Sequence, residues 1–259
     1  MSNYPLATST WDEEELKAIQ SVIDSDKFTM GQFVNSFENN FGKFIKRKYC
    51  VMVSSGSAAN LLSIASLFYT KKPQLKIGDE VIVPAVSWST TFFPLQQFGL
   101  KLKFVDIDLN TLNYDLESLE SSISSNTRMI VAVNLLGNPN DFDKINNIIK
   151  NKNIILFEDN CESLGAEFKG KQTGTFGLLG SFSTYFSHHI STMEGGFVTT
   201  DNEELYHILL SIRAHGWTRN LPDKNKVTNS KNKDSFIESF NFVLPGYNVR
   251  PNEINGLLG

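Results

Sequence analysis

The sequence is poor in the residues that disulfides, metal sites and membrane spans require. It has only two cysteines, Cys50 and Cys161, and neither stands in a CxxC or Cys/His spacing. The sequence therefore indicates no disulfide framework and no metal site, and it favours a reducing cytoplasm. No apolar run approaches the roughly 18 residues that a membrane helix needs. Residues 1–12 also have no basic segment followed by an apolar run, so neither a membrane span nor a secretory leader is expected.

Positive charge is also scarce. The chain has 24 Lys and Arg residues against 28 Asp and Glu, a formal net charge of -4, and no long basic run. This balance argues against nucleic acid and anionic membranes as partners, but a few arginines could still hold a small anionic substrate. With 259 residues, 41% of them hydrophobic, the chain can bury a sizeable core. We expect a soluble protein that binds small molecules.

Apolar β-rich runs alternate with longer, polar-patterned segments, which is typical of βα units around a mostly parallel sheet. Strands are expected at residues 49–54, 80–84, 103–106, 129–134, 154–159, 180–187 and 196–200. Helices are expected at residues 57–69, 116–123 and 141–149, and another begins after Pro251. Residues 221–234 are rich in Lys, Asn and Asp without periodicity, which indicates a mobile loop and raises the possibility of a lid. The predicted fold class is α/β.

The segment SSGSAAN at residues 54–60 follows an expected strand and opens an expected helix. Free N–H groups and the helix dipole at such a start favour an anion, and Gly56 lets the backbone approach it closely. The segment is a candidate phosphate site. An ordinary serine N-cap on a core helix is the alternative interpretation.

The segment EDNCES at residues 158–163 places carboxylates at the end of an apolar strand. Ligands of α/β proteins bind at the carboxyl ends of strands. A buried carboxylate there needs a cationic or protonated partner, and a pyridinium nitrogen is one such partner. Asp159 is the candidate for this role, and a solvated acidic turn is the alternative.

Seven motifs follow one another along the chain: SSGSAAN at 54–60, PAVSWST at 84–90, EDNCES at 158–163, SFS at 181–183, EGG at 194–196, RAHGWTRN at 213–220 and GYNVRPNEI at 246–254. In this order they resemble the DegT/DnrJ/EryC1/StrS family of sugar aminotransferases and dehydratases, which use pyridoxal phosphate (PLP). The resemblance implies the aspartate-aminotransferase fold, fold type I of PLP enzymes. It also implies that residues 1–250 form the PLP-binding large domain with an N-terminal arm. Residues 251–259 would begin a C-terminal small domain, truncated in this chain.

The lysine that binds PLP as a Schiff base in this family stands six residues before the glutamate of EGG, where this chain has His188. No lysine occurs between Lys171 and Lys224, so a shift in register does not restore it. Histidine forms no stable imine, but its pKa of roughly 6.5 suits proton transfer near neutral pH. The resemblance marks this exchange as that of the sugar 3-dehydratase branch and makes His188 the expected catalytic residue. A polar loop histidine is the alternative.

The resemblance implies further cofactor contacts. The phosphate is expected at three residues, Gly56, Ser57 and Ser183. Trp88 would stack on the cofactor ring, with a core tryptophan as the alternative. Asp159 would pair with the ring nitrogen, and Glu162 would lie near the reactive edge of the cofactor.

The resemblance also implies residues that contact the substrate or a second subunit. Asn248 resembles an asparagine that enters a neighbouring subunit's site, which implies a homodimer with shared active sites. Arg219 and Arg250 would clamp a diphosphate or the carboxylates of glutamate, because guanidinium groups match both; surface ion pairs are the alternative. His215 and Tyr247 are expected nearby, without an assigned chemical step.

The implied activity is removal of the C3 hydroxyl from a nucleotide-linked 4-keto-6-deoxy sugar, with GDP-4-keto-6-deoxymannose favoured. PLP would bind noncovalently and receive an amino group from L-glutamate to become pyridoxamine phosphate. The reaction would end with release of ammonia. Two alternatives are an aminotransferase, which would leave the nitrogen in the sugar, and a non-catalytic PLP-binding protein, which would form neither product.

Overall fold

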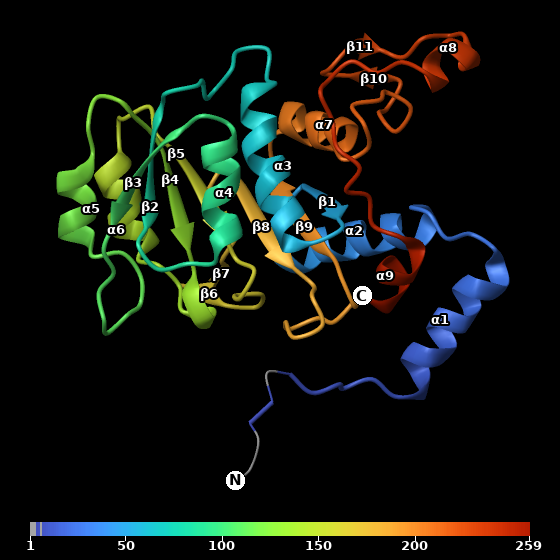
Figure 1. Ribbon diagram of the computed structural model, residues 1–259, viewed down its shortest axis with the longest axis horizontal. Coiled ribbons are helices and arrows are strands. Elements are labelled where there is room, and N and C mark those ends of the chain that lie inside the picture. Colours follow the sequence, from blue (N-terminus) through green and yellow to red (C-terminus); the bar gives the residue numbers. More distant parts are fainter. Residues whose placement is uncertain (1–3, 6) are drawn as a thin grey trace.

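The computed structural model describes residues 4–5 and 7–259. Its centre is a seven-stranded sheet in the order β1-β9-β8-β5-β4-β2-β3 (Figure 1). The strands are β1 (Tyr49–Val53), β2 (Glu80–Pro84), β3 (Lys101–Val105), β4 (Thr127–Val133), β5 (Ile155–Asp159), β8 (Leu179–Ser183) and β9 (Gly196–Thr200). Only β9 runs antiparallel to its neighbours in this sheet. The sheet is mostly parallel, as the sequence predicted.

Helices cover both faces of the sheet, which is why its central strands are apolar on both sides. On one face pack α3 (Gly56–Phe68), α4 (Ser89–Gln97) and α7 (Glu203–Ile212). On the other pack α2 (Gln32–Ile45), α5 (Leu116–Ser122) and α6 (Phe142–Ile149). The side chains of β1 alternate between the two faces. Val51 and Val53 pack in the core on the side of α3, and Met52 packs in the core on the side of α2.

The seven predicted strands and the three predicted internal helices are confirmed, most of them with shifted ends. The largest shift is at the strand predicted over residues 180–187, where β8 ends at Ser183. The helix expected after Pro251 is α9 (Glu253–Leu258). Helices α1 (Glu13–Ser25), α2, α4 and α7 were not predicted.

Residues 221–234 were predicted as a loop without an element, and this is wrong. They contain the hairpin of β10 (Lys224–Asn225) and β11 (Asn229–Ser230), and α8 (Ser235–Ser239) follows. The side chain of Asn225 closes the turn by accepting the N–H groups of Val227 and Thr228, a local turn interaction that hydrophobic periodicity does not detect. The remaining short elements are β6 (Glu167–Phe168), β7 (Lys171–Gln172) and the 3-10 turn η1 (Leu135–Gly137).

Helices near the two ends of the described chain pack together. Helix α9 packs against α1 and α2. The buried carboxylate of Glu253 accepts the N–H groups of Gly31, Phe33 and Val34 at the start of α2, where unpaired N–H groups favour an anion. Across residues 4–5 and 7–259, no helix is long and apolar enough to cross a membrane.

Candidate active site

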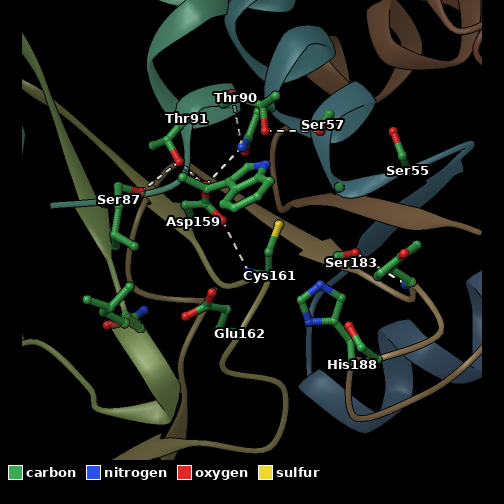
Figure 2. A pocket seen from close by; sticks show the side chains of 18 of the residues that line it. Ser55, Ser57, Ser87, Thr90, Thr91, Asp159, Cys161, Glu162, Ser183 and His188 are labelled. Carbon is green, nitrogen blue, oxygen red and sulfur yellow. Dashed lines mark hydrogen bonds between the residues drawn. The ribbon is translucent and has the colours of Figure 1, made fainter. Parts of the chain in front are cut away.

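A pocket of about 460 Å³ opens at the carboxyl ends of β4, β5 and β8 and at the start of α3 (Figure 2). This is the edge of a parallel sheet where ligands bind. Seven residues predicted for the site line it: Gly56, Ser57, Trp88, Asp159, Glu162, Ser183 and His188. The topology thus brings together residues that span more than half of the chain.

Asp159 is a buried carboxylate, 5% exposed, at the end of β5. Its Oδ2 accepts hydrogen bonds from Asn60 Nδ2 at 2.9 Å and Thr91 Oγ1 at 2.8 Å, and its Oδ1 accepts the Cys161 N–H at 3.1 Å. No lysine, arginine or histidine within the described part of the chain forms an ion pair with it. A buried carboxylate in this position suits a protonated ring nitrogen of a ligand, so Asp159 fits PLP.

The start of α3 can hold a phosphate. Ser55 caps the helix by accepting the Ala58 N–H at 3.1 Å, while the first N–H groups of the helix have no partner within it. Hydroxyls from two other segments lie beside it: Thr90, which accepts from Ser57 Oγ at 3.0 Å, and Ser183. Free N–H groups, hydroxyls and the helix dipole together suit a dianion.

The first residue of α3, Gly56, has no room for a side chain. A Cβ there would lie 2.7 Å from both Cys161 Sγ and Ser183 Cβ. We predict that Gly56→Ala lowers the free energy of unfolding by about 1–3 kcal/mol and weakens PLP binding, measured by denaturant titration of the cofactor-free protein and by PLP titration. As a control, Ser57→Ala adds no volume and should weaken PLP binding with little loss of stability. A Gly56→Ala protein as stable as the unmodified one would contradict this packing.

His188 lies half-buried in the loop between β8 and β9, and its N–H donates to the Tyr185 carbonyl at 2.9 Å. Burial lowers its pKa below the usual 6.5, and the negative charge of Glu162 opposes that shift. The neutral imidazole, which can accept a proton, is therefore the favoured form near pH 7.

Trp88 is the N-cap residue of α4 in the segment after β2, Glu162 follows β5, and both line the pocket. The Trp88 side chain is 72% exposed, so it is not a core residue and its ring is available for stacking. Glu162 Oε2 accepts the Leu136 N–H at 3.1 Å, and Leu136 has a left-handed backbone with φ of 53°.

The other five predicted residues do not line the pocket: Asn248, Arg219, Arg250, His215 and Tyr247. They lie together around Trp217, and we call these five residues and Trp217 the arginine cluster. The Arg219 guanidinium stacks 3.4 Å from the centre of the Trp217 ring, and that of Arg250 lies 5.2 Å from it. Neither arginine forms an ion pair with a described residue. The cluster therefore holds cationic groups outside the pocket of its own chain.

The arginine cluster is held by contacts between two distant segments. The His215 N–H donates to the Tyr247 carbonyl at 2.7 Å, and Asn248 pairs with Ala214 in an isolated bridge. Arg250 Nε donates to Asn248 Oδ1 at 3.0 Å. The segments RAHGWTRN and GYNVRPNEI thus lie side by side and form one surface.

Several pocket residues were not predicted individually: Asn60, Ser87, Thr91, Cys161 and Tyr185. Asn60, Ser87 and Cys161 stand inside motifs already noted, so the sequence contained a signal for them. Motif spacing could not show that the Asn60 amide donates a hydrogen bond to Asp159, 99 residues away. Buried Ser181 extends the hydrogen bonds around Asp159, because its hydroxyl donates to Asn60 Oδ1 at 2.6 Å.

Comparison with known proteins gives close relatives. The chain is 67% identical to a GDP-4-keto-6-deoxy-D-mannose 3-dehydratase of Escherichia coli O55:H7, over 100% of this chain and 67% of the relative. A solved GDP-4-keto-6-deoxymannose-3-dehydratase with a trapped PLP-glutamate geminal diamine matches with a TM-score of 0.98 and 66% identity, over 99% of this chain and 66% of that one. A histidine-to-asparagine mutant of such an enzyme, solved with bound GDP-perosamine, matches with a TM-score of 0.97, 66% identity and the same coverage.

The chain spans about two thirds of the length of these relatives. The solved relatives share its fold over nearly all of the present residues, which identifies the sheet as that of the fold type I PLP enzymes. A model of the DegT/DnrJ/EryC1/StrS aminotransferase family matches residues 9–259. The chain therefore belongs to the DegT/DnrJ/EryC1/StrS aminotransferase family.

Proposed function

We propose that this protein removes the C3 hydroxyl from GDP-4-keto-6-deoxymannose, with PLP as cofactor and L-glutamate as amino donor. The observation that carries the proposal is His188 in the position of the family's lysine, inside a pocket that otherwise suits PLP. The relatives support the substrate, because all three are GDP-4-keto-6-deoxymannose 3-dehydratases by name and one of them was solved with a GDP-linked sugar.

Several residues that line the pocket could hold PLP. When bound, PLP would supply a ring that withdraws electron density from the reacting carbon. Asp159 would keep the ring nitrogen protonated by its negative charge. The start of α3, Ser57 and Ser183 would hold the phosphate, and Trp88 would pack on the ring. These noncovalent contacts take the place of the missing lysine.

His188 moves protons. A nitrogen of its neutral imidazole would accept a proton at the reacting carbon, and the protonated ring would then donate one to the C3 oxygen, which leaves as water. A lysine at the same position would bind PLP covalently and favour transamination. The histidine thus redirects the reaction from an amino sugar to a deoxy sugar.

The overall reaction balances. GDP-4-keto-6-deoxymannose and glutamate give the 3-deoxy ketosugar, 2-oxoglutarate and ammonia, with no net gain or loss of water. The sugar loses one oxygen, the carbon skeleton of glutamate gains one as its amine becomes ammonia, and the two electrons that reduce C3 come from glutamate.

We would incubate the protein with PLP, L-glutamate and the GDP-sugar, and follow the sugar by mass spectrometry and ammonia by enzymatic assay. A sugar lighter by one oxygen with equimolar ammonia is expected. An amino sugar without ammonia would make the protein an aminotransferase. PLP binding with neither product would make it a binding protein.

We also propose that the active site is shared in a homodimer, in which the arginine cluster of one subunit completes the pocket of the other. The support is spatial, because Asn248, Arg219 and Arg250 lie outside their own pocket and the arginines have no described ion-pair partner. Guanidinium groups there suit the diphosphate of the GDP-sugar.

Shared sites predict complementation between two inactive variants. His188→Gln damages the pocket and Asn248→Ala damages the cluster, so each homodimer should be inactive. Random mixing gives hybrid dimers with one intact site, and roughly a quarter of the activity should return by this symmetry argument. The assay is ammonia release after co-refolding or co-expression. Activity that stays at the level of the separate variants would show that Asn248 serves its own subunit.

A further inference from the structure

Glu162 and His188 reach the same pocket from different parts of the sheet. Glu162 follows β5 and His188 lies in the loop after β8, and Figure 2 shows both side chains pointing into the pocket. Among the described residues, no hydrogen bond or ion pair joins the two side chains. A carboxylate that shares a pocket with an imidazole can still offset the positive charge that the ring gains on protonation.

The carboxylate of Glu162 is fixed in direction. Its Oε2 accepts the Leu136 N–H, and no hydrogen bond to its Oε1 is formed by the described residues. Leu136 adopts a left-handed backbone although its side chain is 71% exposed, so side-chain packing does not account for that conformation. Such conformations cost about 1–3 kcal/mol and persist where the surrounding structure enforces them, often at functional sites. The result is one anchored oxygen and one free oxygen.

Several titratable groups face His188 from its own loop and from the elements around it: Asp159, Cys161, Glu162, Tyr185, His189 and Glu194. Both oxygens of Asp159 already accept hydrogen bonds from the protein. Burial raises the pKa of the Cys161 thiol well above its usual value, so it stays neutral. Among the charges that act on His188, Glu162 has the largest effect.

We propose that Glu162 is a positioning residue for His188, which stabilises from across the pocket the positive charge that the ring gains when it accepts a proton. This rests on the proposed function for its use in catalysis. The proton stays on the imidazole, the carboxylate remains ionised, and no covalent bond changes. Glu162 thereby acts on the proton carrier and not only at the cofactor edge.

The test is an NMR titration of the four histidines in protein free of cofactor and substrate, with His188→Gln used for assignment. Glu162→Gln should lower the midpoint of His188 by about one pH unit, and Glu162→Asp should restore most of it. Glu194→Gln is the matched control, because Glu194 lines the same pocket but should leave the midpoint unchanged. An unchanged midpoint in Glu162→Gln, or an equal shift in Glu194→Gln, would overturn the pairing.

Because this titration needs no substrate, it is independent of the proposed reaction. In the active protein, a base with a lower pKa loses its proton at lower pH. The acidic limb of the kcat/KM profile should therefore move to lower pH in Glu162→Gln by the same amount, as that profile reports the free enzyme. A shifted NMR midpoint without a shifted profile would retain the pair but remove His188 as the rate-determining base.

Discussion

Replacing His188 with glutamine should lower the rate of deoxy-sugar formation about 10²–10⁴-fold, the usual contribution of a positioned acid–base residue. PLP affinity should change little, because Asp159, Ser183 and the start of α3 are untouched. Steady-state ammonia release and a PLP titration monitored by absorbance measure the two quantities. The separation of rate from affinity distinguishes a proton carrier from a binding residue.

His189 offers the matched control for this change. It is the next residue in the loop, it is exposed, and it does not line the pocket. His189→Gln should keep nearly full activity. Equal losses in both variants would mean that the loop as a whole is needed, and the specific role of His188 would be contradicted.

Replacing His188 with lysine tests whether position 188 faces the cofactor. His188→Lys should bind PLP covalently, so that borohydride reduction leaves the cofactor attached and mass spectrometry finds it on the peptide containing position 188. The unmodified protein should carry no such adduct on this peptide, because histidine forms no stable imine. A lysine variant without the adduct would mean that position 188 does not face the cofactor.

Asp159→Asn should have the second large effect, a loss of about 3–5 kcal/mol in stabilisation of the transition state, which is about 10²–10⁴-fold in rate. The amide has no negative charge for the ring nitrogen. Its NH₂ group also replaces one of two oxygens that both accept hydrogen bonds, Oδ2 from Asn60 and Thr91 and Oδ1 from the Cys161 N–H. In either orientation a donor therefore faces a donor. Single-turnover kinetics on PLP-loaded protein would measure the loss.

Thr91→Val is the control for Asp159. It removes one of the donors to the carboxylate but keeps the charge, so it should cost about 1 kcal/mol and far less activity. If Asp159→Asn were no worse than Thr91→Val, the carboxylate charge would not be what the ring nitrogen requires.

The sheet could be predicted because its strands are short apolar runs between turn residues. The predicted bounds of β2 and β9 agree with the structure, and both strands are almost entirely buried. Helix α7 was missed although the sequence signals its start: Asn202 caps the helix by accepting the Glu204 and Leu205 N–H groups, and acidic residues fill the first turn. Because this cap comes directly after β9, the end of the strand and the start of the helix are hard to separate in the sequence.

The pocket could be predicted from motif order, and its internal network could not. Gly56, Asp159 and His188 stand in segments whose chemistry is local, namely a helix start, a strand end and the position of a lysine. The bonds that orient Asp159 come from Asn60 and Thr91, 99 and 68 residues away. No sequence spacing encodes such contacts, because they depend on the order of strands in the sheet.

The most direct test of the central claim, that His188 redirects an aminotransferase site to deoxygenation, follows the nitrogen of ¹⁵N-labelled glutamate. The protein with PLP and the GDP-linked 4-keto-6-deoxy sugar should release all of the label as ammonia, in equal amount to a sugar that has lost its C3 oxygen and contains no ¹⁵N. Label retained in an amino sugar that keeps its C3 hydroxyl would contradict the claim.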